Sequence, residues 1–86
     1  MENKVLISVL FPELEKRFDV FIPVNEIIWK IKKLMLKSIT DLCDIDLSVK
    51  ETSLINLETG HIYGNNDIVI NTDIRNGTEL LLVSEN

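Results

Sequence analysis

The sequence predicts an α+β fold in which one long helix covers a mixed sheet of four to five strands. Segments with alternating hydrophobic residues lie near both ends of the chain, and a longer segment between them has helical periodicity. The chain has 86 residues, 45% of them hydrophobic, which is enough for one core and too few for two. We therefore expect a single domain over residues 1–86.

The first two strands are expected to form an antiparallel hairpin. Two alternating sets share residues 4–10: Val5, Ile7 and Val9 on one side, Leu6, Ser8 and Leu10 on the other. Residues 11–16 break the alternation and are expected to form the connection. In residues 17–22 the core side is Phe18, Val20 and Ile22, and Phe21 faces the other way.

A helix is expected next, from Glu26 to about Thr40 and at most to Cys43. Pro23 ends the second strand because it has no N–H for the sheet, and Asn25 is expected to cap the helix. At about 100° per residue, the large apolar residues share one face. That expected core face comprises Ile27, Ile28, Ile31, Leu34, Met35, Ile39 and Leu42.

In the second half of the chain, the sequence pattern predicts shorter secondary-structure elements. Residues 41–50 are acidic and aperiodic, so we expect a helix end and a loop. Strands are expected at 52–57, 62–63 and 78–83, with turns at 58–61, 64–67 and 76–77. The segment 68–74 is expected to bury Ile68 or Ile70 together with Ile74.

The last strand is expected to alternate, with Leu80 and Leu82 inward and Leu81 and Val83 outward. The first and last strands should then pair in parallel at the centre of the sheet.

The amino-acid composition of the chain excludes several classes of function. A single Cys excludes an internal disulfide, and one Cys with one His is too few for a structural zinc site. The net charge of −5 argues against general nucleic-acid binding. No segment approaches the length of a membrane span, and the first residues lack the pattern of a signal peptide. We therefore expect a cytoplasmic protein.

No catalytic, cofactor or metal site is expected. His61 follows Gly60 in a turn and has no nucleophile nearby in sequence, and the acidic neighbours of Cys43 disfavour a reactive thiolate. Asp41, Asp44 and Asp46 alternate as in a calcium loop but lack its glycine and later glutamate. Four lysines are expected to form a solvated helix face: Lys30, Lys32, Lys33 and Lys37.

Two apolar surfaces are candidate protein interfaces. Trp29 and Leu36 lie away from the expected helix core, with Lys33 beside them; the alternative is that residues 38–50 fold back over them. The second is the sheet face opposite the helix, where alternation places Leu6, Leu10, Phe21, Leu81 and Val83. Scattered exposure or a register shift by one residue are the alternatives.

The element order resembles the ubiquitin-like β-grasp fold. The likeness lies in the hairpin followed by Pro23 and the helix, in Thr59-Gly60, and in the ending Ile74-x-x-Gly77-x-x-Leu80-x-Leu82. Within that superfamily the chain is similar to the small YukD/EsaB-like proteins of Gram-positive type VII secretion systems. The similarity lies in size, in Asp19-Val20-Phe21-Ile22-Pro23, in the apolar helix and in the ending.

The resemblance implies a non-catalytic adaptor or regulatory component that acts by protein contact, with secretion-system membrane components or a second copy of the chain as partners. An alternative is an accessory subunit of a multicomponent bacterial oxygenase. A ubiquitin-like modifier is disfavoured, because the chain ends Val83-Ser84-Glu85-Asn86 where modifiers carry a Gly-Gly tail.

Overall fold

A computed structural model describes residues 3–43 and 52–84, with side chains described through Ser38 in the first range. The elements are β1 (Lys4–Phe11), η1 (Pro12–Leu14), β2 (Lys16–Pro23), α1 (Ile28–Cys43), β3 (Thr52–Asn56), η3 (Val69–Asn71) and β4 (Glu79–Ser84). The four strands form one sheet in the order β2-β1-β4-β3. β1 and β4 are parallel and the other two pairs are antiparallel, which confirms the expected central parallel pair.

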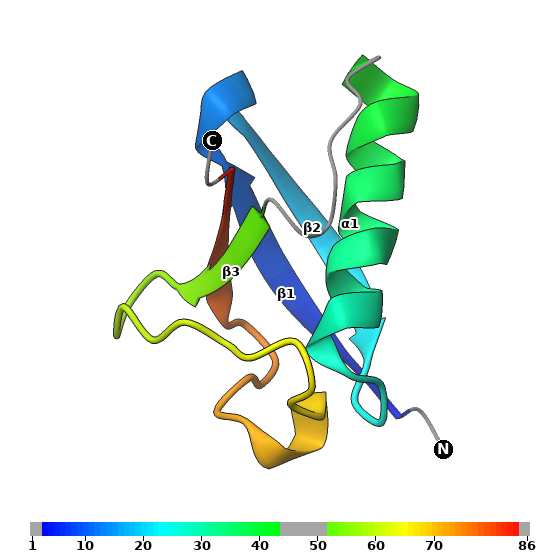
Figure 1. The fold of residues 1–86 in the computed structure, drawn as a ribbon, viewed down its shortest axis with the longest axis vertical. Coiled ribbons are helices and arrows are strands. Elements are labelled where there is room, and N and C mark those ends of the chain that lie inside the picture. The colour runs from blue at the N-terminus through cyan, green and yellow to red at the C-terminus, as the bar shows by residue number, and fades with distance from the viewer. Residues whose placement is uncertain (1–2, 44–51, 85–86) are drawn as a thin grey trace.

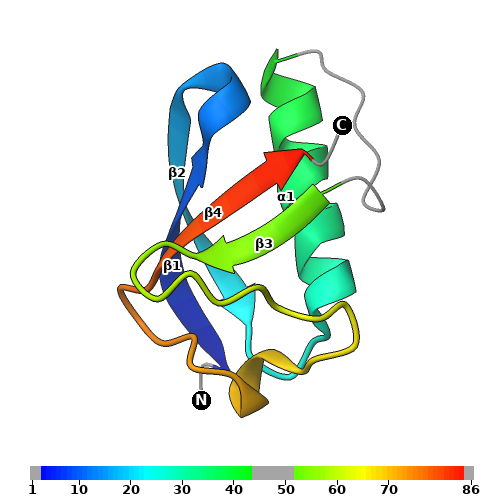
Figure 2. The ribbon, with the colours of Figure 1, turned by 60° about the vertical axis from the view of Figure 1, so that its left-hand side comes forward.

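α1 lies along one side of the sheet, and the long connection between β3 and β4 closes one end of the molecule (Figure 1). Figure 2 shows β4 between β1 and β3, with α1 behind them. The core fills the space between the sheet and the helix. Its fully buried residues include Ile7, Val9, Phe11, Ile22, Ile28, Ile31, Leu54, Val69, Ile74, Leu80 and Leu82.

The alternation predicted for the two hairpin strands, β1 and β2, is confirmed, with one extension. Phe11, expected in the connection, is the last residue of β1 and is completely buried. The connection that follows is a single short turn, closed by Glu15 in a left-handed conformation with φ 52°. Pro23 ends β2, as expected. The hairpin therefore contributes one more core residue than the pattern predicts.

The start of α1 corrects the expected capping. The helix begins at Ile28, three residues after Asn25, so Asn25 is not its N-cap. Instead, the N–H groups of Ile28 and Trp29 donate to the carbonyls of Asp67 and Asn65, at 2.8 and 3.0 Å. Backbone groups from the β3–β4 connection thus satisfy donors that a helix N-terminus leaves free.

The buried face of α1 is also rotated from the expected one. Leu36 is 4% exposed and Lys32 is 3% exposed, whereas Leu34 is 52% exposed. Both predictions, that Leu36 is exposed and that Lys32 is solvated, are therefore wrong. Lys32 can be buried because its ammonium donates to the Thr52 carbonyl at 2.9 Å, so its aliphatic stem can lie in the core. The side chains of Ile39, Leu42 and Cys43 lie outside the described residues.

The β3–β4 connection differs from expectation at its buried positions. Val69 is fully buried, while Ile68 and Ile70 are exposed; Ile74 is buried as expected. Val69 turns inward because its N–H donates to the Glu26 carbonyl at 3.0 Å and that of Ile70 to the Val24 carbonyl at 2.7 Å. The expected short strand at 62–63 is a single bridge between Ile55 and Ile62. Within the expected acidic loop, α1 extends to Cys43 and residues 44–50 lie outside the described residues.

Candidate protein interface

The open face of the sheet, opposite α1, gathers the outward side chains of all four strands. Strand alternation places Leu6, Leu10, Phe21, Leu81 and Val83 there, as the sequence predicts. Phe21 is 62% exposed and Leu6 39%, while Leu10, Leu81 and Val83 are half-buried. That this face binds a partner remains a prediction.

One apolar row crosses the open face. Leu10 on β1 pairs with Leu81 on β4, and Leu81 pairs with Ile55 on β3. Ile55 in turn bridges to Ile62, which is 61% exposed. Four large aliphatic side chains therefore stand side by side across three strands and the neighbouring bridge, and we call these four residues the apolar row.

A polar strip separates the apolar row from a second apolar pair. Arg17 donates to Ser8 Oγ at 3.4 Å and forms an ion pair with Glu79 at 3.2 Å. Both charged side chains are about half exposed, so the ion pair contributes little to stability and mainly fixes the arginine across the sheet. Four of the five residues predicted for this face are thus divided between two patches, while Val83 lies beside the apolar row, paired with Ser53.

The second patch is the cross-strand pair of Leu6 and Phe21. Leu6 is fixed from its other side, where its N–H donates to Asn76 Oδ1 and its carbonyl accepts from Gly77 N–H, both at 2.8 Å. Gly77 has a φ of +87°, which favours glycine in that turn. The turn before β4 therefore holds the backbone of Leu6 in place beside Phe21.

Two residues of the apolar row, Ile55 and Ile62, are missing from the surface predicted from the sequence. Leu57, which is also exposed, follows Ile55 closely in the chain. Ile55 and Ile62 complete the row, but no face was assigned to the third strand. The inner face of β3 is hard to recognise in the sequence because Thr52 and Asn56, both polar, are buried there with Leu54. Burial in β3 alternates strictly in the structure, but the sequence Thr52-Ser53-Leu54-Ile55-Asn56 has no matching alternation of hydropathy that would assign Ile55 to the open face.

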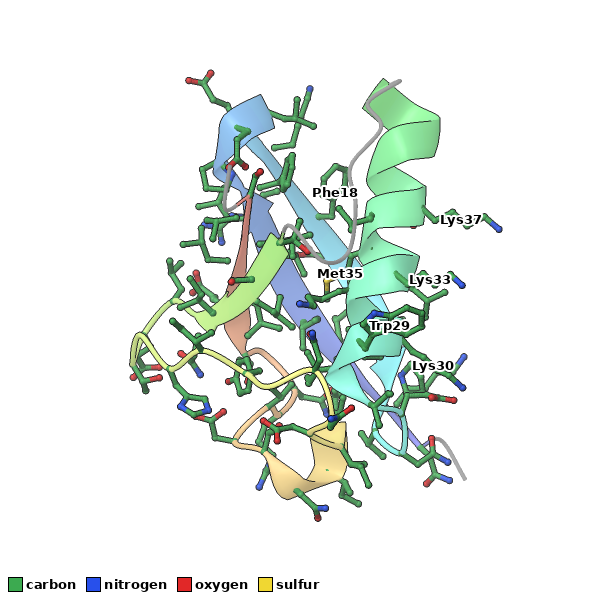
Figure 3. All side chains as sticks on the ribbon, viewed as in Figure 1. Phe18, Trp29, Lys30, Lys33, Met35 and Lys37 are labelled. Atoms are coloured by element: carbon green, nitrogen blue, oxygen red, sulfur yellow. The ribbon has the colours of Figure 1, made fainter. Side chains whose placement is uncertain are left out.

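The second predicted surface, Trp29 with Leu36 and Lys33, does not exist as one patch. Leu36 faces the core, whereas Trp29 is half-buried at the helix surface. The Lys33 ammonium lies over the Trp29 ring, 5.3 Å from its centroid, which is a cation–π contact (Figure 3). Trp29 and Lys33 remain on the surface together, without Leu36.

A polar cluster fixes the loop that carries Ile62. Asn56 is 7% exposed, and its amide donates to the Tyr63 hydroxyl at 3.1 Å and to Asp73 at 3.4 Å. Its oxygen accepts the N–H groups of Glu58 and Thr59 at 2.9 and 3.1 Å. The Tyr63 hydroxyl donates to Asp73. One side chain thus ties β3, the following turn and the approach to β4 together.

Tyr63 is held in its neutral form by this cluster. Burial, reinforced by the hydrogen bond to Asp73, raises the pKa of Tyr63 from 10.0 to about 12. The hydrogen bond from Asn56 acts in the opposite direction and is outweighed. Tyr63 is therefore a structural hydroxyl at neutral pH.

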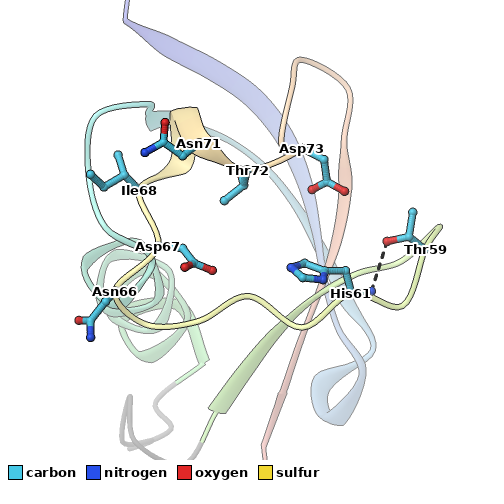
Figure 4. A pocket seen from close by; sticks show the side chains of 8 residues that line it. All are labelled: Thr59, His61, Asn66, Asp67, Ile68, Asn71, Thr72 and Asp73. Atoms are coloured by element: carbon cyan, nitrogen blue, oxygen red, sulfur yellow. Dashed lines mark hydrogen bonds between the residues drawn. The ribbon is translucent and has the colours of Figure 1, made fainter.

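A hollow of about 590 Å³ lies beside this cluster (Figure 4). His61 borders it, exposed, with its backbone N–H donating to Thr59 Oγ1 at 3.2 Å and its ring edge against Tyr63. Asp67 and Asp73 also line it, yet within residues 3–43 and 52–84 no group of three or more potential ligands could hold a metal ion. The turn covers residues 57–59, so His61, expected in the turn, lies just after it.

The comparisons with known proteins bear on the fold. A ubiquitin-like domain from Arabidopsis thaliana matches with a TM-score of 0.78 and 16% identity, covering 99% of this chain and 81% of that one. The UBL domain of Plasmodium falciparum Dsk2 matches with a TM-score of 0.75 and 18% identity, covering 94% and 97%. The chain has the ubiquitin-like β-grasp fold.

Another structure with the ubiquitin-like fold is a chain of the toluene 4-monooxygenase HD complex. It matches with a TM-score of 0.79 and 7% identity, covering 95% of this chain and 99% of that one. No protein-family model and no curated protein matches the sequence. Among the described helices, none has the length and apolar character needed to cross a membrane.

Proposed function

We propose that this chain is a non-catalytic ubiquitin-like adaptor that binds a protein partner through the open face of its sheet. The observation that carries the proposal is the apolar row of Leu10, Leu81, Ile55 and Ile62, with Phe21 and Leu6 beyond the polar strip. Large side chains flanked by fixed polar groups are the composition of a protein interface. The strands hold the backbone of these residues in place, so binding requires little ordering of the backbone.

The cellular setting we propose is cytoplasmic, as an accessory or regulatory component of a Gram-positive type VII secretion system. The supporting features are the likeness to YukD/EsaB-like proteins in Asp19-Val20-Phe21-Ile22-Pro23 and in the ending at Leu80–Leu82. The partner would be a membrane component of that system. A homodimer formed through the same face is the other arrangement that the apolar row supports.

A second candidate function is an accessory subunit of a multicomponent oxygenase. The match to a chain of the toluene 4-monooxygenase complex favours it, because that chain has nearly the same length and fold. In that role the chain would again act by contact. The identity of the captured partner separates the two functions: a secretion-system membrane protein supports the first, and a di-iron hydroxylase supports the second.

The test uses exposed residues that can be changed without opening the core. Ile62→Glu places a charge on the apolar row, and Phe21→Glu does so on the second patch. Ile70→Glu is the matched control, because Ile70 is 60% exposed, close to the 61% of Ile62, but lies on η3. Affinity capture from cells of the source organism, followed by binding measurements with the purified partner, reports the effect.

We expect Ile62→Glu or Phe21→Glu to weaken partner binding at least about tenfold, as loss of a central interface residue does. Ile70→Glu should bind as the unchanged chain does, and all three variants should keep their melting temperatures within a few degrees. Equal binding by all three variants would exclude the open face. Sedimentation of the unchanged chain at high concentration tests the homodimer.

A further inference from the structure

The turn before β4 contains the only Asn-Gly pair of the chain, Asn76-Gly77. An asparagine in such a pair is chemically labile, because the main-chain nitrogen of the next residue can attack its side-chain amide carbon. Glycine favours this attack, since it has no side chain to obstruct the approach. Both residues are exposed, so water reaches them. The pair is therefore a candidate modification site that needs water as its only co-reactant.

The modification is deamidation, and it proceeds in two steps. The Gly77 nitrogen forms a bond to Cγ of Asn76 and loses its proton, while the side-chain nitrogen takes up a proton and leaves as ammonia. The product is a five-membered cyclic imide. Water then opens this ring at one of its two carbonyls, which gives aspartate or, with the main chain rerouted through the side chain, isoaspartate. No oxidation or reduction takes place.

Three hydrogen bonds hold the turn against β1. The Leu6 N–H donates to Asn76 Oδ1 at 2.8 Å, and the Gly77 N–H donates to the Leu6 carbonyl at 2.8 Å. The Ser8 N–H donates to the Thr78 carbonyl at 3.0 Å. Figure 2 shows this segment, in orange, beside β1. The attacking nitrogen and the attacked amide group are thus both bound to Leu6, and the nitrogen must leave its acceptor before it can react.

The turn also closes on itself in a conformation that keeps the reacting atoms apart. The Thr78 N–H donates to the Arg75 carbonyl at 3.0 Å, and the Arg75 N–H donates to Thr78 Oγ1 at 2.8 Å. With a negative φ at Asn76 and a φ of +87° at Gly77, this is a type II turn. Such a turn holds ψ of its second residue at about +120°, which directs the Gly77 nitrogen away from Cβ of Asn76. Ring closure needs both atoms on one side of the bond between Cα and the carbonyl carbon, so the turn must open first.

We propose that Asn76 is a site of spontaneous deamidation that is silent while the turn is closed against β1 and reactive when the turn opens. Isoaspartate lengthens the main chain by one carbon between Arg75 and Gly77, so the altered turn releases Leu6. Aspartate keeps a side-chain oxygen in the place of Oδ1, so that product keeps the bond to Leu6. The inference goes beyond the proposed function and does not depend on a partner.

The test compares the folded full chain with the chain unfolded in urea, both incubated in the same mildly alkaline buffer. Peptide mass spectrometry measures the gain in mass at Asn76, and enzymatic methylation detects isoaspartate. We expect Asn76 to react at least about tenfold faster in urea, because only the open fraction of the folded chain can react. Asn66, exposed but followed by Asp67, is the internal reference and should react more slowly than Asn76 in urea.

Thr78→Ala tests the role of the closed turn. It removes the Oγ1 acceptor of the Arg75 N–H, so it should raise the rate at Asn76 several-fold in the folded chain. Thr59→Ala is the matched control, because Thr59 Oγ1 likewise accepts a backbone N–H, from His61. It should leave the rate at Asn76 unchanged. In urea both variants should react as the unchanged chain does, which assigns the difference to the fold.

Hydrogen exchange of the separated products tests the consequence for β1. In the isoaspartate form, the Leu6 amide should exchange faster, while the amide of Val9, which pairs with Phe18, should keep its protection. Asn76→Asp carries the other product and should keep Leu6 protected. Asn76→Ala removes the acceptor without any reaction and should expose the Leu6 amide as isoaspartate does.

Three results would overturn the inference. Equal rates at Asn76 and Asn66 in urea would mean that the Asn-Gly pair is not reactive. Equal rates at Asn76 in the folded and the unfolded chain would mean that the turn gives no protection. Protection of the Leu6 amide that survives in the isoaspartate form would mean that the modification does not release Leu6. None of these measurements involves a partner, so the proposed function stands or falls separately.

Discussion

Leu34 and Leu36 are the same side chain on the same helix, yet they have opposite surroundings. Leu36 belongs to the core with Ile28 and Met35, whereas Leu34 is 52% exposed and lines a hollow between α1 and β2. Hydrophobic burial contributes in proportion to the area removed from water, so the two leucines must differ in their contribution to stability. This difference makes them a matched pair.

Leu36→Ala should lower the free energy of unfolding by about 2–5 kcal/mol, because it leaves a cavity in the core. Leu34→Ala should cost less than about 1 kcal/mol. Urea denaturation followed by Trp29 fluorescence measures both. Equal losses of unfolding free energy in the two variants would contradict the helix orientation. If Leu36→Ala does not change stability, Leu36 lies on the surface, as the sequence predicts.

Lys32 has a different role from the other helix lysines. Its ammonium donates to the Thr52 carbonyl and its stem is buried, so Lys32→Ala removes both packing and a hydrogen bond. We expect a loss of about 1–3 kcal/mol. Lys37→Ala, an exposed position on the same helix, should change stability by less than about 0.5 kcal/mol.

Lys32→Met separates the two parts of that loss, because methionine keeps most of the stem without the ammonium. A stability between those of the unchanged chain and Lys32→Ala is expected from denaturant midpoints. If Lys32→Ala and Lys37→Ala have the same midpoint, the contact between α1 and β3 contributes nothing.

At the scale of elements, β3 depends on the side chain that ends it. Asn56 makes four side-chain hydrogen bonds, to Tyr63, Asp73 and the backbone of Glu58 and Thr59. Asn56→Ala leaves buried polar groups of the cluster with fewer partners, so we expect a loss of about 2–4 kcal/mol. Asn66→Ala, at an exposed position of the same connection, should be nearly neutral.

The same substitution has a local readout. The Tyr63 N–H donates to the Leu54 carbonyl at 3.0 Å, and the bridge from Ile55 to Ile62 lies beside it. Faster hydrogen exchange at Tyr63 in Asn56→Ala, with little change at β1, would show that Asn56 positions Ile62 on the open face. Uniformly faster exchange over the sheet would instead indicate only a global loss of stability.

The strands could be predicted from the sequence and the orientation of the helix could not, for a physical reason. In β1, β2 and β4 each side of the sheet recurs at every second residue, so Leu80 and Leu81 cannot exchange faces without moving the whole strand. A helix can rotate by a fraction of a turn. α1 buries Ile28, Ile31, Met35 and Leu36. Lys32 shares this buried face, because its ammonium donates to the Thr52 carbonyl, which is distant in sequence.

The same limit explains the candidate interface. Leu6, Leu10, Phe21, Leu81 and Val83 could be placed on the open face because their strands alternate clearly. Ile55 and Ile62 could not, because their positions depend on the buried polar side chains of Thr52 and Asn56 and on one bridge between segments. Tertiary hydrogen bonds decide those positions, and hydropathy does not report them.

At the scale of the whole molecule, the two faces of the sheet have different compositions. The open face carries the apolar row and the Arg17–Glu79 ion pair, while the inner face packs the core against α1. The parallel strands β1 and β4 contribute to both faces, with Leu10 and Leu81 in the apolar row and Val9 and Leu80 in the core.

The stability of the whole domain should also depend on the ionisation of Tyr63 at alkaline pH. The folded chain holds the Tyr63 proton more tightly than the unfolded chain, with a pKa of about 12 against 10.0. The stabilisation is therefore complete below about pH 10 and is lost as the pH rises towards about 12.

Tyr63→Phe is the control that isolates this effect, because Tyr63 is the only tyrosine of the chain and the substitution leaves every other titratable side chain in place. We expect the unchanged chain to be the more stable at neutral pH, and its advantage over Tyr63→Phe to shrink as the pH rises above about 10. Urea midpoints measured at several pH values test this. Parallel midpoint curves for the two chains would mean that the buried hydroxyl does not couple folding to proton binding.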